Sequence, residues 1–186
     1  MTTSMLSDSS KYVYSAIREE DDFAEGLRRQ GKQVIKLSSG DPALYFPTPK
    51  YIIDAYVEAL VNGKTSYSRS QGVLELVNAV IGRYRSRYGL SITEQDVVVT
   101  SGVAEALTFI NSALINSGDT AVILKPYYTQ YPGAIQMFGG KFLLGKYDES
   151  NDWSIDPDAL AKLVRKRRAI SKGIKYMLIT NPNNPT

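Results

Sequence analysis

The segment Thr100-Ser101-Gly102-Val103-Ala104-Glu105-Ala106 combines a strand end, a glycine and a helix start. Such a junction offers unpaired backbone amides and the positive end of a helix dipole, which together suit a phosphate dianion. Taken alone, a tight turn of this kind is more often a simple connection between elements. It matches neither the Walker A loop nor the three-glycine dinucleotide fingerprint. The segment is therefore a candidate anion site of another kind.

A second candidate is Lys125-Pro126-Tyr127-Tyr128-Thr129-Gln130-Tyr131, which also follows an expected strand. A tyrosine held at the carboxyl edge of a sheet by a rigid proline can stack on a flat heteroaromatic cofactor. The alternative is that these tyrosines pack the loop, which is the commoner role in a chain that contains 13 of them.

The third candidate is Asn181-Pro182-Asn183-Asn184-Pro185-Thr186, which follows the apolar run at residues 175–180. Two Asn-Pro pairs place rigid backbone and amide side chains where open α/β sheets bind ligands. The amide of Asn184 can donate to a phenolate oxygen, although an Asn-Pro pair by itself is usually a turn. A free carboxylate at Thr186 would lie beside core structure, so we expect the chain to be the first part of a longer protein.

Composition limits the possible chemistry. The chain has no histidine and no cysteine, which excludes disulfides, Ser-His triads, Cys or His nucleophiles and most zinc sites, and we predict no metal site. Hydrophobic residues at 43% and charged residues at 22% are typical of a globular protein. The net charge of +3 does not call for nucleic acid or a membrane surface. No apolar run approaches the roughly 20 residues that a membrane-spanning helix needs, and the first residues show no leader pattern, so we expect a cytoplasmic protein.

Helical and strand periods alternate along the sequence. Helical patterns cover residues 15–30, 51–61, 73–88, 104–115, 130–137 and 156–168. Strand patterns cover residues 34–37, 97–100, 120–124, 141–144 and 174–180. Strands separated by helices predict βαβ crossovers, and hence an α/β fold with a mostly parallel sheet and flanking helices.

Five segments, taken in order, resemble the class I/II aminotransferases, a fold-type I family that uses pyridoxal 5'-phosphate (PLP). They are Leu37-Ser38-Ser39-Gly40-Asp41-Pro42, Tyr67-Ser68-Arg69-Ser70-Gln71-Gly72, Thr100-Ser101-Gly102, Pro126-Tyr127-Tyr128 and the closing Asn-Pro segment. The resemblance covers nearly the whole chain. It implies a three-layer αβα large domain that is incomplete here. Residues 1–45 would form the amino-terminal arm and part of the small domain, and residues 46–186 the first part of the large PLP-binding domain, truncated at Thr186.

The resemblance also implies roles at the substrate and the cofactor phosphate. Gly40 would lie where the backbone approaches the substrate carboxylate, and Tyr67 would reach the cofactor phosphate of the partner subunit. The amides of Gly102, Val103 and Ala104 would hold the phosphate of their own subunit. Many relatives place Ser or Thr where this chain has Val103 and Ala104, so the phosphate would depend here on amides and on groups further along.

At the cofactor ring, the resemblance implies that Tyr128 stacks on the pyridine and that Asn184 hydrogen-bonds its 3'-oxygen. Tyr128 is preferred to Tyr127 because the family pattern is Pro-x-Tyr. No lysine in the sequence matches the family's Schiff-base lysine, which is expected beyond Thr186 together with an Asp and an Arg. We therefore place no catalytic residue in this segment and expect it to be inactive alone.

The resemblance thus predicts an enzyme of amino acid metabolism that transfers an amino group between an amino acid and a 2-oxo acid. It further predicts a homodimer with shared active sites. A PLP-dependent β-elimination lyase shares the same early motifs. A non-catalytic remnant, or a dimerisation or split-enzyme module, is the other alternative.

A basic cluster at residues 162–168 supports an alternative hypothesis, that of a nucleic-acid-binding protein, since it could contact the phosphates of nucleic acid. Its cations lie on a predicted helix whose other side is apolar, and positive charge is favourable at a helix C-terminus. We interpret the cluster as a solvated helix face and predict no nucleic-acid partner.

Overall fold

The computed structural model describes residues 5–13, 16–35, 37, 40–168 and 173–184. The chain forms two compact units. The first contains Met1–Val34 together with Val103–Thr186, and the second contains Ile35–Gly102. The predicted domain division between residues 45 and 46 concerns a larger fold and stays a prediction.

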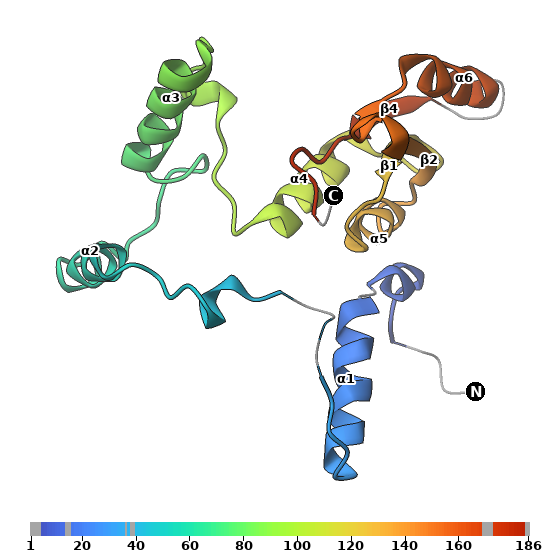
Figure 1. Ribbon diagram of the computed structural model, residues 1–186. Helices are drawn as coiled ribbons and strands as arrows, with labels where there is room; N and C mark the ends of the chain where they lie inside the picture. The colour runs from blue at the N-terminus through green and yellow to red at the C-terminus, as the bar shows by residue number, and fades with distance from the viewer. Residues whose placement is uncertain (1–4, 14–15, 36, 38–39, 169–172, 185–186) are drawn as a thin grey trace. The chain divides into compact units, whose positions relative to one another are not determined.

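The first unit is built on a four-stranded sheet with the strand order β3-β2-β1-β4. Figure 1 labels β2, β1 and β4 of this sheet. The strands are β1 (Thr120–Lys125), β2 (Lys141–Asp148), β3 (Ser154–Ile155) and β4 (Ile174–Leu178). β1 pairs in parallel with both β2 and β4, and only the two-residue β3 runs antiparallel to its neighbour. The predicted α/β fold with a mostly parallel sheet is confirmed.

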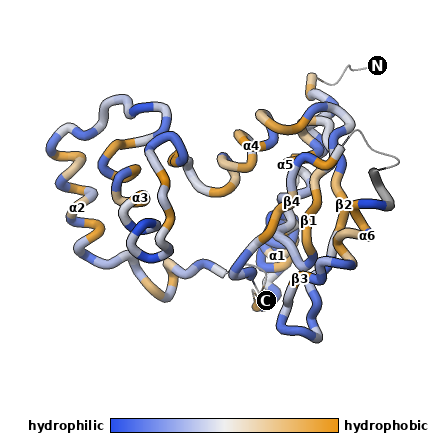
Figure 2. Tube along the Cα trace, turned by 90° about the horizontal axis from the view of Figure 1, so that it is seen from above, coloured by the Kyte–Doolittle hydropathy of each residue, from blue (hydrophilic) through white to orange (hydrophobic). Residues whose placement is uncertain are grey.

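The core of this unit surrounds β1, which is buried from Ala121 to Leu124. A continuous apolar run is typical of a parallel strand that is covered on both faces, and Figure 2 shows β1 as hydrophobic. Ala121 and Ile123 face a layer formed by α4 and α5, whereas Val122 and Leu124 face a layer formed by α6. These helices are α4 (Val103–Leu114), α5 (Gln130–Gln136) and α6 (Pro157–Arg168).

Towards the amino terminus, the first unit also contains η1 (Asp8–Tyr12) and α1 (Ala16–Arg29), and η4 (Glu149–Asn151) lies between β2 and β3. Gly133 of α5 lies directly under η1, because a Cβ built on it would come 2.5 Å from the carbonyl oxygen of Tyr12. No helix in the described parts of the chain is both long and apolar enough to cross a membrane.

The second unit contains η2 (Pro42–Leu44), α2 (Lys50–Val61), α3 (Leu74–Tyr88) and η3 (Glu94–Asp96). Gly63 ends α2 with φ +70°, a conformation that favours glycine, and its amide donates to the carbonyl of Leu60. Gly72 has φ +113°, and a Cβ there would lie 2.7 Å from the Cβ of Val99. The chain therefore needs glycine at this close approach.

Two of the predicted strands are wrong, because their described residues do not pair with a neighbouring strand. Among the described residues of 34–37 no strand forms, and Lys36 lies outside them. Residues 97–100 form no ladder either, although Val97 is extended and the amide of Val99 donates to the carbonyl of Gln71. A β-branched run is compatible with a strand, but pairing requires a neighbour from elsewhere in the chain. The predicted helices form, with each end within one residue of its predicted position, and Ser15 lies outside the described residues.

A charged contact fixes the turn that leads into β1. The carboxylate of Asp119 is buried, accepts a hydrogen bond from the amide of Asn116 at 2.9 Å and lies 3.4 Å from the ammonium of Lys175. The hydrogen bond from Asn116, aided by the charge of Lys175, lowers the pKa of Asp119 in spite of its burial. A carboxyl whose pKa is lowered on folding stabilises the fold above its unfolded pKa, and this stabilisation is lost as the pH falls through the folded pKa.

Asp119→Asn should therefore lower the free energy of unfolding at neutral pH, and its difference from wild type should shrink as the pH falls below the ordinary carboxyl value of 3.8. Urea unfolding followed by circular dichroism between pH 7 and about pH 3 measures this difference. Asp22→Asn, at an exposed carboxylate in α1, serves as the control and should track the wild type. A difference that does not depend on pH would contradict the assigned role of Asp119.

Candidate functional site

The start of α4 has the geometry of an anion site. Gly102 adopts φ +86°, which favours glycine, and it directly precedes Val103, the first residue of a 12-residue helix. The carbonyl of Gly102 accepts a hydrogen bond from the hydroxyl of Thr100 at 3.0 Å. The first amides of a helix have no acceptor within the helix, so those at Gly102, Val103 and Ala104 suit a phosphate.

The loop after β1 separates its two neighbouring tyrosines. Tyr127 packs against the buried layer of α4 and α5, whereas Tyr128 remains 44% exposed. The ring of Tyr128 meets that of Tyr131 edge to face, with centroids 5.7 Å apart and planes at 77°. Tyr128 is therefore the ring of the pair that a flat ligand could reach, while Tyr131 steadies it from the core side.

The loop after β4 lies against the loop after β1. The side-chain amide of Asn183 donates to the carbonyl of Pro126 at 3.2 Å. Asn184 is exposed, and the two residues that follow it, Pro185 and Thr186, lie outside the described residues. The structure therefore brings the segment that carries Asn184 next to the segment that carries Tyr128.

A cavity of about 520 Å³ lies between α4 and the loop after β4. α4 and α5 contribute Val103, Leu107, Ile110 and Tyr131 to its lining. The other side is formed by β4 and by the residues that follow it as far as Pro182. Val103 of the candidate phosphate site and the loop after β4 thus line one cavity, and Tyr131, which contacts Tyr128, lines it too.

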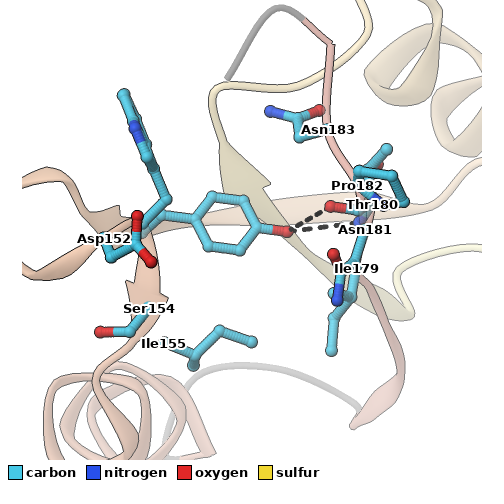
Figure 3. Close-up of a pocket in the computed structure, with 10 residues that line it drawn as sticks. Asp152, Ser154, Ile155, Ile179, Thr180, Asn181, Pro182 and Asn183 are labelled. Atoms are coloured by element: carbon cyan, nitrogen blue, oxygen red, sulfur yellow. Dashed lines mark hydrogen bonds between the residues drawn. The ribbon is translucent and has the colours of Figure 1, made fainter.

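A second cavity, of about 430 Å³, lies beside the loop after β4 and is drawn in Figure 3. Its lining includes Tyr147 at the end of β2 and the turn before β3, where Asp152 and Trp153 have φ values of 51° and 55°. The hydroxyl of Tyr147 donates to the carbonyl of Thr180 and accepts from the amide of Thr180, both at 3.3 Å. Sequence reasoning missed Tyr147 and Thr180, because neither belongs to a recognisable motif.

The two remaining predicted site residues, Gly40 and Tyr67, belong to the second unit. Tyr67 is fully exposed, and a Cβ built on Gly40 would meet no other atom within 4 Å. The backbone of Gly40 and the ring of Tyr67 are thus both accessible within their own unit.

A polar pair formed by the buried Asn111 and the half-buried Tyr176 links α4 to β4. The hydroxyl of Tyr176 donates to the side-chain oxygen of Asn111 at 2.6 Å, and the side-chain amide of Asn111 donates to the carbonyl of Leu107 at 2.8 Å. Asn111 has no exposed surface, and burial raises the pKa of Tyr176 against the effect of this hydrogen bond. This pair has no signature in the sequence, since an Asn in an apolar helix and a Tyr in a strand are both common.

With this geometry in place, comparison with known proteins defines the family. The sequence pattern of the family "Aminotransferase class I and II" matches residues 32–186. The aspartate/prephenate aminotransferase of Thermus thermophilus is 34% identical over 160 residues, covering 86% of this chain and 40% of the relative. The aspartate aminotransferase of Bacillus subtilis is 31% identical, covering 88% of this chain and 39% of the relative.

Solved structures agree with this result. The alanine aminotransferase of Pyrococcus furiosus superposes with a TM-score of 0.84 at 35% identity, over 97% of this chain and 45% of that one. The aspartate aminotransferase of Thermus thermophilus with maleate gives 0.83 at 32% identity, over 99% and 46%. The chain belongs to the class I and II aminotransferase family, whose members depend in general on PLP, and it spans about 40% of the length of the curated relatives it matches.

Tyr176→Phe should lower the free energy of unfolding by about 1–3 kcal/mol, because the side-chain oxygen of Asn111 would stay buried without its donor. Replacing both partners, as in Asn111→Leu with Tyr176→Phe, should cost less than the sum of the two single changes. Urea unfolding of the four proteins measures the coupling. Tyr88→Phe, at an exposed ring, is the control. Additive effects of the two changes would show that the pair does not act as a unit.

Proposed function

We propose that the chain provides the phosphate, ring and 3'-oxygen contacts of a PLP site in an aminotransferase. The enzyme would transfer an amino group between an amino acid and a 2-oxo acid. The observation that carries this proposal is the cavity that Val103 shares with the loop after β4. The bond from Asn183 to Pro126 joins that loop to the loop that bears Tyr128.

The residues at this place fit the three binding features of PLP. Amides at the start of α4, with the positive end of the helix dipole, suit its phosphate dianion. The exposed ring of Tyr128 suits its pyridine, and the amide of Asn184 suits its phenolate oxygen. PLP supplies an electron sink when it is bound, and the protein supplies binding, orientation and charge. The work of these residues is to hold the cofactor in one orientation rather than to move protons.

The lysine that the family uses for covalent attachment of the cofactor has no match in this sequence. The complete site would therefore need residues that the chain does not contain. In the proposed homodimer, Tyr67 reaches the phosphate bound by the partner subunit, and the backbone at Gly40 approaches the substrate carboxylate. The exposure of both residues supports these roles. The relatives are named for several different amino acids, so the proposal is limited to the general classes of amino acid and 2-oxo acid.

The ring contact can be tested with pyridoxine 5'-phosphate, which lacks the aldehyde and so cannot react with lysines. Trp153, the single tryptophan of the chain, lines the cavity beside the loop after β4 and reports binding by fluorescence. Tyr128→Ala should weaken binding about fivefold through the loss of one aromatic contact, whereas Tyr128→Phe should keep it. Tyr84→Ala is the matched control, because Tyr84 is exposed to nearly the same extent, 43%. Equal affinity of Tyr128→Ala and wild type would exclude Tyr128 from the site.

The lysine assignment has its own test. After treatment with PLP and borohydride, this chain should carry no stoichiometric adduct at one specific lysine, and it should catalyse no amino transfer. Peptide mass spectrometry locates any reduced adduct. A single lysine labelled to completion would show that the chain holds its own covalent cofactor residue, contrary to the proposal.

A further inference from the structure

Because β1 ends before β2 does, the sheet has a gap at the edge where its parallel strands have their carboxyl ends. Lys125, the last residue of β1, pairs with Lys146 of β2, and Ile123 pairs with Leu178 of β4. The chain then turns away at Pro126, whereas β2 continues to Asp148. Beyond Lys125, the described strands therefore place nothing between β2 and the chain that extends from β4.

Tyr147 crosses this gap with its side chain. It follows Lys146 directly, and its hydroxyl contacts both the amide and the carbonyl of Thr180 at 3.3 Å. The dashed lines beside Thr180 in Figure 3 mark these two hydrogen bonds. A phenolic hydroxyl can donate one hydrogen bond and accept another, so one atom serves both backbone groups of Thr180. Tyr147 thus makes the contacts with the extension of β4 that a neighbouring strand would otherwise make.

Tyr131 reaches Thr180 from the opposite layer of the unit. Its hydroxyl shares a hydrogen bond with the hydroxyl of Thr180 at 3.2 Å, and its ring packs edge to face on Tyr128. Tyr147 packs with the α6 layer, and Tyr131 belongs to the buried layer of α4 and α5. Thr180 is therefore held from both faces of the sheet.

Three residues of the loop that follows Thr180 are exposed, namely Asn181, Pro182 and Asn184. Its position therefore depends on the contact of Asn183 with Pro126 and on Thr180, the residue from which the loop starts. We propose that Tyr147 and Tyr131 are positioning residues that fix Thr180 and thereby set the place of the loop 181–184 beside Tyr128. The proposal rests on the proposed cofactor site, in which this loop and Tyr128 make the oxygen and ring contacts. Neither positioning residue needs to touch the cofactor.

Amide hydrogen exchange in the full chain, followed by NMR, tests the anchoring directly. Tyr147→Phe should speed exchange at Asn181, Asn183 and Asn184 about fivefold, as the loss of a net hydrogen bond implies. Thr180→Val, which removes the hydroxyl contacted by Tyr131 at nearly constant size, should act in the same direction. The double variant should exceed either single one.

Tyr176→Phe is the matched control. It removes the hydrogen bond that the half-buried Tyr176 of β4 donates to Asn111 but leaves every contact of Thr180 in place. In Tyr176→Phe, the exchange rates of the loop amides and of the β1 amides should rise by the same factor. In Tyr147→Phe, the exchange rates of the loop amides should rise, and those of the β1 amides should stay at the wild-type values. Exchange at the three loop amides that is no faster in Tyr147→Phe than in Tyr176→Phe overturns the proposal.

Affinity for pyridoxine 5'-phosphate separates the positioning role from the proposed function. If the wild-type chain binds the probe, Tyr147→Phe should bind it about fivefold more weakly, whereas Tyr88→Phe, at an exposed ring of the second unit, should bind it as well as wild type. Unchanged binding by Tyr147→Phe overturns the positioning role even where exchange is faster. If the wild-type chain does not bind the probe, the proposed cofactor function of this chain fails, and the exchange comparison alone decides whether Thr180 is anchored.

Discussion

Burial of β1 is the constraint on which the first unit depends. A strand with partners on both edges and helices on both faces has no water near its backbone, so its polar groups must be paired and its side chains apolar. The run from Ala121 to Leu124 meets both requirements. Because side chains alternate along a strand, these four residues also divide the core into two layers. The helices α4, α5 and α6 then cover the faces that β1 defines.

This arrangement determines where a ligand can bind. Parallel strands end at the same edge, so the loops that leave β1 and β4 emerge side by side. The contact from Asn183 to Pro126 is a direct result. The start of α4 reaches the same region because α4 packs on the layer that contains Ala121 and Ile123. The candidate anion site at the helix end, an aromatic loop and an amide-bearing loop are thus brought together by sheet geometry, although they are far apart in the sequence.

Much of this could be predicted from the sequence, because the signals are local. A period of 3.6 residues marked the helices, and the apolar runs marked β1, β2 and β4. The strands expected at residues 34–37 and 97–100 were wrong because a strand requires a partner, which a local pattern does not reveal. The two residues of β3 are too few to show a period. The predicted site segments carry local chemical signatures, namely Gly before a helix, Pro-Tyr-Tyr and Asn-Pro. The contacts that hold them do not, since a tyrosine such as Tyr147 looks the same in the sequence whether it packs or spans a gap.

The pair of Asn111 and Tyr176 has a consequence for the history of the sequence. Between two apolar surfaces, a helix can shift or rotate slightly at small cost, whereas a buried amide and hydroxyl satisfy each other in only one arrangement. The pair therefore fixes the register of α4 on β4, and with it the height of the helix end above the sheet. Loss of either partner leaves the other buried without its bond, while loss of both leaves an ordinary apolar contact. We therefore expect positions 111 and 176 to change together, as a polar pair or as an apolar pair, because either change alone carries the cost of an unpaired polar group.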